Sequence, residues 1–489
     1  MAVLAAFAVP HPPLIIPVVG RGEERGIQAT VDAYDEVGRR IAELAPETVV
    51  VSSPHSIMYR DYIHVSPGAG ASGSFAQFRA PEARYEVTYD TELVERLCAL
   101  CIDEGLDAGC EGERDPSLDH GTMIPLHFIQ KFMPLEAVKV VRIGISGLSP
   151  AEHYRLGALV QRAAADLGRR VVYVASGDLS HKLLAEGPYG FAPEGPVFDE
   201  LTCDAFASGD LLALLTADPG LCERAAECGL RSFQIMAGAL DGTPIRAELL
   251  SHEGPFGVGY AVAAFTPEGD EGTDGARRLL PRYLAWRRGD LDDRRAHEDL
   301  FVRLARASLE SWVRDGKRVR PTPALLDRLA SEAVADGMTP EDATIQADEL
   351  ASAQAGAFVS LKIDGQLRGC IGTIAPTCGS VAEEVCQNAV SACAHDPRFL
   401  PVRKDELDSL VYDVDVLGEA EEVAGTDGLD VRRYGVIVSC ADGRRGLLLP
   451  DLDGVDTVDE QVSIAAHKGG IDLASDDYRL ERFEVIRHL

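Results

Sequence analysis

The sequence predicts an α/β domain followed by an α+β domain. Up to about residue 266, short β-branched runs alternate with longer segments whose apolar residues recur at helical spacing. A Gly-rich, acidic stretch at 266–275 interrupts this alternation, and two turn signals of the Asp-Gly type follow farther on. The 489 residues also exceed the usual length of one domain, so we expect two.

In the first domain, placed at 1–266, the runs at 3–9, 48–51 and 171–175 are short, β-branched and bounded by Pro, Gly or Ser, which predicts buried strands. We expect further strands at 138–145, 245–251 and 258–265. The predicted helices are 26–44, 90–105, 150–167, 197–216 and 219–228. Strands and helices in this alternation favour a parallel or mixed central sheet with helices on both faces.

Residues 267–294 are predicted to form a linker, with a short helix at 276–292, and the second domain is placed at 295–489. Its first element is an amphipathic helix at 296–314. Asp364-Gly365 predicts a hairpin between 358–363 and 367–374, because Asp-Gly is a favoured two-residue turn. The remaining predicted elements are strands at 411–417, 436–439 and 447–449 and helices at 380–394 and 457–468.

The composition excludes some partners. The net charge of −32 argues against a nucleic-acid partner, which needs a basic face. No apolar run approaches the roughly 20 residues of a membrane span, so we expect no membrane partner. The first 20 residues lack Lys or Arg before their apolar stretch, which favours mature structure and a cytoplasmic protein. A homo-oligomer stays an open alternative.

The eleven cysteines are scattered, and we expect them to be reduced. Cys98-Ala-Leu-Cys101 has the C-x-x-C spacing, but it lies within a helical pattern and has no second pair at zinc spacing. Helix packing is the favoured interpretation of this pair, and a redox or metal role is the alternative.

Three histidines follow three of the predicted strands: His11, His55 and His181. Ligands of open α/β sheets bind beyond the carboxyl ends of the strands, so these imidazoles should converge on one cleft. The segments 118–122 and 251–253 add His120, His252 and Glu253. Two imidazoles and one carboxylate with open positions form the facial triad of non-haem Fe(II) oxygenases. A single histidine at a strand end is more often a cap or a surface residue, so the prediction depends on the whole set.

These segments resemble the class III extradiol dioxygenase family, the LigB-like fold that also includes the Memo proteins. The matching motifs, in the family's order, are His11-Pro-Pro, Ser53-Pro-His55, Asp119-His120-Gly121-Thr122, Gly177-Asp-Leu-Ser-His181 and Glu253-Gly-Pro-Phe-Gly-Val-Gly-Tyr260. The resemblance implies that His11, His55 and Glu253 hold Fe(II), that His181 is the acid–base residue, and that His120 supports bound dioxygen or substrate. It also implies a small aromatic substrate, a catechol or aminophenol, whose ring is cleaved with O₂.

Glu253 and its neighbour His252 compete for the place of the third ligand. Successive side chains of an extended segment point to opposite faces, so only one of them readily reaches the cleft. Glu253 is favoured because a carboxylate offsets the charge of the metal and because Gly254-Pro255 follows it as in the family pattern. A three-histidine site is the alternative, and Memo proteins replace the carboxylate with another type of ligand.

The second domain resembles the AMMECR family through Leu367-Arg-Gly-Cys-Ile-Gly-Thr373, supported by 391–399 and 446–450. Arg368 is a candidate anion contact, Cys370 is either a packed residue or a nucleophile, and His395 belongs to a helix-end turn or to the wall of a site. The family's cysteine before a Lys-Ala-Gly segment is absent from Ala465-Ala-His-Lys-Gly-Gly470.

The chain thus looks like a fusion of two components of the AmmeMemoRadiSam system, whose third component, a radical-SAM protein, is the expected partner on a separate chain. Three functions follow from the two resemblances: an Fe(II)-dependent ring-cleavage dioxygenase, a Memo-like metal-dependent redox or modifying protein without ring cleavage, and a metal-binding scaffold for the radical-SAM partner. The first is favoured.

Overall fold

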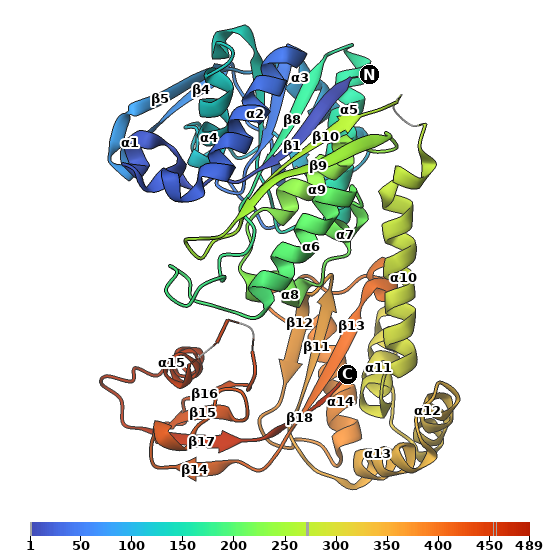
Figure 1. Ribbon diagram of the computed structural model, residues 1–489. Coiled ribbons are helices and arrows are strands. Elements are labelled where there is room, and N and C mark those ends of the chain that lie inside the picture. The colour runs from blue at the N-terminus through green and yellow to red at the C-terminus, as the bar shows by residue number, and fades with distance from the viewer. Residues whose placement is uncertain (1, 270–272, 453, 456) are drawn as a thin grey trace. The chain divides into compact units, whose positions relative to one another are not determined.

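The computed structural model describes residues 2–269, 273–452, 454–455 and 457–489, and it divides into two compact units, 1–287 and 288–489 (Figure 1). Each unit has its own hydrophobic core. In the part of the chain that the structure describes, no helix is both long enough and apolar enough to span a membrane.

The first unit is built on a six-stranded mixed sheet in the order β7-β2-β8-β1-β10-β9. The strands are β1 (Val3–Val9), β2 (Thr48–Ser52), β7 (Lys139–Ile143), β8 (Val171–Ser176), β9 (Ile245–Glu253) and β10 (Tyr260–Pro267). The first four in spatial order run parallel, whereas β10 is antiparallel to β1 and β9 is antiparallel to β10. The predicted mixed or parallel sheet is confirmed as a mixed sheet.

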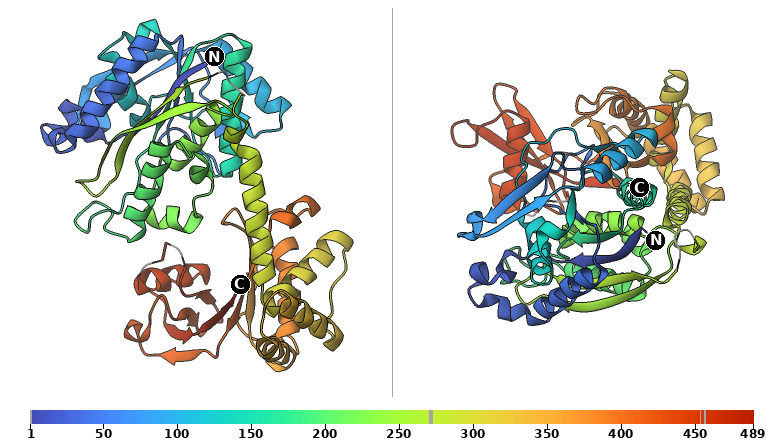
Figure 2. Two further views of the ribbon diagram at one scale, coloured as in Figure 1. Left: turned by 45° about the vertical axis from the view of Figure 1, so that its right-hand side comes forward. Right: turned by 90° about the horizontal axis from the view of Figure 1, so that it is seen from above.

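Alternation along β1 divides the core between the two faces of this sheet. Ala6 and Ala8 belong to one apolar cluster, and Phe7 and Val9 belong to the other. Helices cover both faces, as Figure 2 shows and as the prediction required. Residues of α2 (Gln28–Leu44) and α4 (His120–Gln130) join the cluster of Phe7, and those of α3 (Thr91–Asp103), α5 (Pro150–Asp166), α6 (Glu194–Ser208) and α9 (Leu230–Ala239) join the other.

Some elements of the first unit differ from prediction. The helix expected at 197–216 ends at Ser208, because Gly209 takes the left-handed conformation, with φ 74°, that stops a helix. The short helices α7 (Leu212–Leu215) and α8 (Pro219–Ala225) follow it. The hairpin of β4 (Gly70–Phe75) and β5 (Ala80–Thr88) was not predicted, since β4 contains two glycines and no β-branched residue. Shorter elements are α1 (Pro17–Gly20), β3 (Ile63–His64) and β6 (Ala108–Gly109).

The predicted linker, 267–294, is largely helical where it is described, and its residues 270–272 lie outside the described part. Helix α10 (Leu279–His297) occupies most of it and contains the boundary between the units. Leu279 and Tyr283 are buried in the core of the first unit. The start of this helix therefore belongs to the first unit rather than to a free linker.

The second unit combines helices with two antiparallel sheets, which confirms the α+β prediction. Its helices are α11 (Leu300–Asp315), α12 (Pro323–Ala335), α13 (Pro340–Ser352), α14 (Val381–Ala394) and α15 (Val458–Lys468). One sheet has the order β12-β11-β13-β18 and the other β14-β17-β15-β16. The strands are β11 (Ala357–Ile363), β12 (Gln366–Gly372), β13 (Val411–Leu417), β14 (Glu421–Val423), β15 (Gly435–Cys440), β16 (Arg445–Leu448), β17 (Tyr478–Phe483) and β18 (Val485–His488). Asp364 and Gly365 both have positive φ, as the predicted tight turn requires.

Candidate functional site

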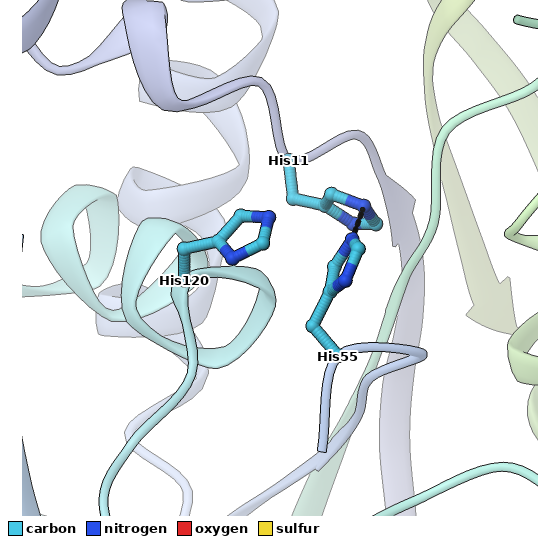
Figure 3. A group of neighbouring side chains, drawn as sticks. All are labelled: His11, His55 and His120. Carbon is cyan, nitrogen blue, oxygen red and sulfur yellow. Dashed lines mark hydrogen bonds between the residues drawn. The ribbon is translucent and has the colours of Figure 1, made fainter. Parts of the chain in front are cut away.

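Three histidines converge beyond the carboxyl edge of the first unit's sheet (Figure 3). His11 follows β1, His55 follows β2, and His120 is the first residue of α4. One ring nitrogen from each lies within 4.8 Å of those of the other two. The Nε2 atoms of His11 and His55 are 2.9 Å apart, and the rings of His55 and His120 have centroids 4.1 Å apart. A group of this kind could hold a metal ion.

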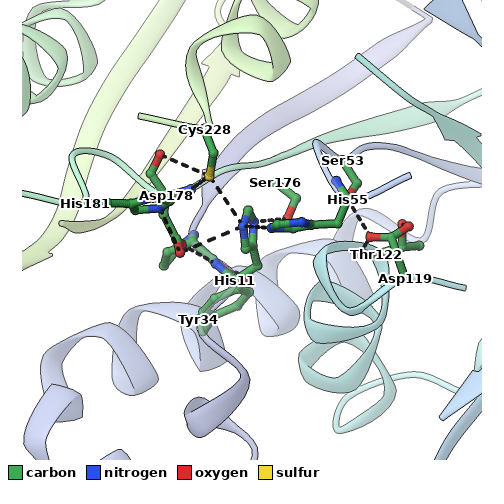
Figure 4. A network of polar contacts seen from close by, with 11 residues as sticks. His11, Tyr34, Ser53, His55, Asp119, Thr122, Ser176, Asp178, His181 and Cys228 are labelled. Carbon is green, nitrogen blue, oxygen red and sulfur yellow. Dashed lines mark hydrogen bonds and ion pairs between the residues drawn. The ribbon is translucent and has the colours of Figure 1, made fainter. Parts of the chain in front are cut away.

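Local structure explains why the loop of His55 meets the helix of His120. Asp119 caps α4, since its Oδ1 accepts a 2.9 Å hydrogen bond from the backbone N–H of Thr122. The same carboxylate oxygen accepts a 2.6 Å hydrogen bond from the hydroxyl of Ser53, two residues before His55 (Figure 4). One carboxylate therefore fixes both the start of the helix and the loop after β2.

A second group shares His11. Its ligand atoms come from His11, Asp178 and Cys228, again within 4.8 Å of one another. Asp178 Oδ1 accepts a 2.7 Å hydrogen bond from the backbone N–H of His11, and the Sγ atom of Cys228 lies 3.5 Å from His11 Nε2 (Figure 4). Sequence reasoning missed Cys228 because no spacing or motif distinguishes it from the other cysteines. Asp178 lay within a matching motif, but its neighbour His181 was selected instead.

The electrostatics of the cluster favour neutral imidazoles. Burial, and then the proximity of His55, holds the pKa of His11 well below its usual range. The same two causes lower the pKa of His120 to about 3, and burial lowers the pKa of His55. Neutral imidazole is the form that binds a metal ion. The three rings are therefore ready to act as ligands at neutral pH.

Asp178 is a buried carboxyl whose pKa is raised to about 6 by burial, against the opposing effect of the hydrogen bond from His11. Its Oδ2 lies 4.0 Å from Nε2 of His181, which follows β8 as predicted. The ring of His181 stacks on Tyr189 with centroids 5.1 Å apart. Asp178 and His181 thus form a carboxyl–imidazole pair next to His11.

Glu253, the carboxylate expected to be a ligand, lies elsewhere. Its Oε2 accepts hydrogen bonds of 2.7 Å from both the backbone N–H and the hydroxyl of Thr30. Thr30 lies in the first turn of α2, where backbone N–H groups have no partner within the helix and attract a carboxylate. Among the described residues, Glu253 belongs to neither ligand group. In the structure His120, and not Glu253, groups with His11 and His55, so the ligand role that the resemblance implied for Glu253 stays a prediction.

His252 also lies outside both ligand groups of the described residues. Its Nε2 lies 2.8 Å from Oδ2 of the buried Asp199, and this contact raises the pKa of His252 to about 10. The structure does contain a group of three histidines, but its third member is His120 and not His252. His153, interpreted from the sequence as structural, is buried, and its Nδ1 and Nε2 contact the backbone of Ser149 and Ser146.

The donor set fits a transition-metal ion. Imidazole nitrogens suit iron, copper, nickel and zinc, and the nearby thiol of Cys228 adds a soft donor. The three-histidine group contains no carboxylate, whereas the second group has that of Asp178.

The predicted anion contact of the second unit, Arg368, has partners of its own. Its guanidinium forms a two-pronged pair with Glu406, with N–O distances of 2.7 and 3.1 Å. It also donates hydrogen bonds to the carbonyl oxygens of Leu400 and Pro401. All of these contacts join β12 to the segment that leads into β13, so Arg368 acts as a structural clamp.

Cys370 and His395 do not form one group with Arg368. The backbone N–H of Cys370 donates a 2.9 Å hydrogen bond to Asp396, and its thiol accepts a 3.2 Å hydrogen bond from Ser360. Burial raises the pKa of the Cys370 thiol, which disfavours the nucleophilic thiolate. His395 directly follows α14 as its C-cap and is exposed, which agrees with the helix-end interpretation.

The fold and the histidine cluster define an α/β unit with a candidate metal site, joined to an α+β unit. Residues 5–263 match the family model described as the catalytic LigB subunit of aromatic ring-opening dioxygenase, and residues 302–488 match the AMMECR1 model. The chain therefore belongs to the LigB family through its first unit and carries an AMMECR1 domain in its second. Both resemblances inferred from the motifs are confirmed.

Similarity to other proteins extends over the whole chain. Protein CA_C1420 of Clostridium acetobutylicum is 38% identical over 504 residues, which cover 100% of this chain and 99% of that protein. A Thermotoga maritima protein is 45% identical over 192 residues, which cover 39% of this chain and 98% of that protein. The crystal structure of the uncharacterized protein PH0010 from Pyrococcus horikoshii is 27% identical, with a TM-score of 0.32 over 39% of this chain and 89% of that one.

Proposed function

We propose that the first unit binds Fe(II) through His11, His55 and His120 and oxidises a small aromatic substrate, a catechol or an aminophenol, with O₂. The observation that carries this proposal is the convergence of three neutral imidazoles at the carboxyl edge of the sheet. Membership of a family described by aromatic ring opening supports the choice of substrate and reaction. Both oxygen atoms of O₂ would enter the product as the ring opens next to the diol.

In this proposal Fe(II), when bound, supplies a Lewis-acidic and redox-active centre where the substrate oxygens and O₂ meet. The protein's contribution is to place the ligands and to move protons. His181 is neutral near pH 7, because burial lowers its pKa, so it can accept a proton from a substrate hydroxyl. The carboxylate of Asp178, 4.0 Å away, then stabilises the resulting imidazolium.

The second ligand group favours a different function. His11, Asp178 and Cys228 combine imidazole, carboxylate and thiol, and a sulfur ligand suits copper(I) or zinc better than an oxygen-activating Fe(II) centre. This set would fit a Memo-like metal-dependent redox or modifying protein without ring cleavage. Both groups include His11, so metal analysis must distinguish them through the residues that they do not share.

The test compares two variants of the full chain, His120→Ala and Cys228→Ala. Each is loaded anaerobically with Fe(II), desalted and analysed for metal. Under the proposed function, His120→Ala loses stoichiometric iron and Cys228→Ala retains it. His127→Ala, on the same helix and paired with Tyr85, is the matched control. The reverse outcome would assign the metal to the cysteine-containing group.

The reaction is tested by O₂ uptake of the iron-loaded protein with a panel of catechols and aminophenols. Consumption of one O₂ per ring opened, lost in His120→Ala, supports the dioxygenase. Stoichiometric iron without O₂ uptake across the panel would favour the Memo-like function. We further propose a separate radical-SAM partner, because the chain combines LigB and AMMECR1 domains, as in the AmmeMemoRadiSam system that it resembles, and has no C-x₃-C-x₂-C pattern of its own. Dependence of activity on that added protein is the corresponding test.

A further inference from the structure

A pair of thiols lies in the first unit outside both histidine groups. Cys98 lies on α3 and Cys110 lies directly after β6. Their Sγ atoms are 3.4 Å apart, and both residues are partly exposed. The C-x-x-C spacing pointed to Cys101 as the partner of Cys98, but Cys101 is fully buried in the core and packs as a small hydrophobic residue.

The backbone between the two elements lets the thiols approach. Gly109 has φ 154°, and a Cβ atom there would lie 2.6 Å from the hydroxyl of Tyr62 and 3.7 Å from Sγ of Cys98. A side chain at this position would displace Tyr62. The absence of one allows the chain to pass close to α3, so that Cys110 faces Cys98.

We propose that Cys98 and Cys110 form a reversible dithiol–disulfide pair that is oxidised by a low-molecular-weight disulfide of the glutathione type. A disulfide needs an S–S distance of about 2.0 Å, so the two sulfur atoms must close by about 1.4 Å from their present contact. Both side chains are partly exposed, which gives a small disulfide access to them. This proposal does not depend on the metal or on the proposed reaction.

The exchange proceeds in two balanced steps. The Cys98 thiolate attacks one sulfur of the small disulfide, which forms a mixed disulfide and releases one small thiolate. The Cys110 thiol then gives its proton to the released small thiolate and attacks Cys98 Sγ, which forms the protein disulfide and releases the second small thiolate. The small disulfide is reduced by two electrons, and the protein dithiol is oxidised by two. The hydrogen bond between the thiols lowers the pKa of Cys98 and raises that of Cys110, which selects Cys98 as the first nucleophile.

The bridge would constrain a segment that leads toward the histidine cluster. Residues 110–119 run from Cys110 to the cap of α4. The buried side chain of Arg142 donates hydrogen bonds to the carbonyl oxygens of Asp115 and Ser117 in this segment. A disulfide at Cys110 would fix the other end of the segment 110–119 covalently. Oxidation should therefore make local unfolding of this segment less frequent.

The test incubates the full reduced chain with glutathione disulfide, alkylates the remaining thiols and maps the peptides. We expect two of the eleven thiols to be lost, the mass to fall by that of two hydrogen atoms, and the bridge to join Cys98 to Cys110. Cys101→Ser is the matched control and should form the same bridge. Cys98→Ser should leave Cys110 as a free thiol.

A bridge that includes Cys101, a stable glutathione adduct on Cys98 beside a free Cys110, or eleven unchanged thiols would each overturn the proposal. Because the mapping is done on the wild-type chain, a variant that fails to fold does not decide the result. Hydrogen exchange of 110–119 gives a second measurement. It should slow on oxidation of the wild type and of Cys101→Ser, and unchanged exchange in the bridged protein would refute the proposed anchoring.

Discussion

The carboxyl edge of the first unit's sheet and strand β12 of the second unit both carry side chains that the sequence marks as reactive, but their surroundings differ. At the sheet edge, imidazole nitrogens of His11, His55 and His120 face one another. In β12, Arg368 donates hydrogen bonds to Glu406 and to two carbonyl oxygens, and the Cys370 thiol is buried. Parallel strands end together and leave polar groups in a shared cleft, whereas Arg368 lies within an antiparallel strand and is bonded to the segment that leads into β13. A motif alone therefore does not distinguish a site from a structural clamp.

The largest expected effect is on metal binding. His11 belongs to both ligand groups, so His11→Ala should abolish stoichiometric metal whichever group is used. We expect affinity to fall by more than about 100-fold, since even outer-shell partners of a metal site cost 10–100-fold. Metal analysis after anaerobic loading measures this, with His127→Ala as the control. Full retention of metal by His11→Ala would show that neither ligand group holds the metal, and the contrast between the sheet edge and β12 would fail.

His181 should matter for turnover and not for metal content. Its ring belongs to neither ligand group. Its Nε2 lies 4.0 Å from Oδ2 of Asp178, a position in which it can accept or donate a proton. His181→Ala should lower the rate of the proposed oxidation by about 10²- to 10⁴-fold, the usual range for a lost acid–base group. Rates and metal content are measured on the same samples. Loss of metal in parallel with activity would make His181 a ligand.

In the second unit the prediction concerns stability. Arg368→Ala removes a two-pronged ion pair and two hydrogen bonds to carbonyl oxygens. We expect the free energy of unfolding to fall by about 1–3 kcal/mol, with metal content unchanged. Urea denaturation measures the change. Arg403→Ala, whose pair with Asp405 is exposed, should be nearly neutral. If Arg368→Ala leaves stability unchanged, Arg368 is not a clamp.

The buried histidines of the first unit should make it sensitive to acid. Burial lowers the pKa of His153 to about 3, below its value of about 6.5 in the unfolded chain. Its contribution to stability is thus fully present above pH 6.5 and is lost as the pH falls toward 3. At pH 5 the loss is about 2 kcal/mol. Hydrogen exchange between pH 7.5 and 5 checks this, and His153→Gln should weaken the dependence. An unchanged dependence in that variant would refute the assignment.

The smallest expected effect concerns Glu253. Glu253→Gln should keep its metal and lose about 0.3–1 kcal/mol, because a neutral amide replaces the carboxylate at the start of α2. Metal analysis and urea denaturation of one preparation report both quantities. Loss of metal in Glu253→Gln would restore the carboxylate as a ligand and revive the facial triad.

Much of the fold could be predicted from local pattern. The β-branched runs at 3–9, 48–51 and 171–175 became three adjacent strands, and the Asp364-Gly365 turn formed where expected. The hairpin β4–β5 was missed because glycine and serine carry little strand signal. Helices α12 and α13 were also missed, although Thr322 and Thr339 cap them with a proline following each.

The sequence by itself determined that His11, His55 and His181 would stand at the ends of strands, because hydrophobic runs and their Pro and Ser boundaries are local signals. Only the tertiary structure decided which side chains meet. His120 lies in the cluster because Asp119 caps α4 next to it. Glu253 accepts hydrogen bonds from Thr30, and Cys228 contacts His11 although 217 residues separate them in the sequence. Such contacts depend on how distant elements pack, and the spacing of residues along one chain does not contain that information.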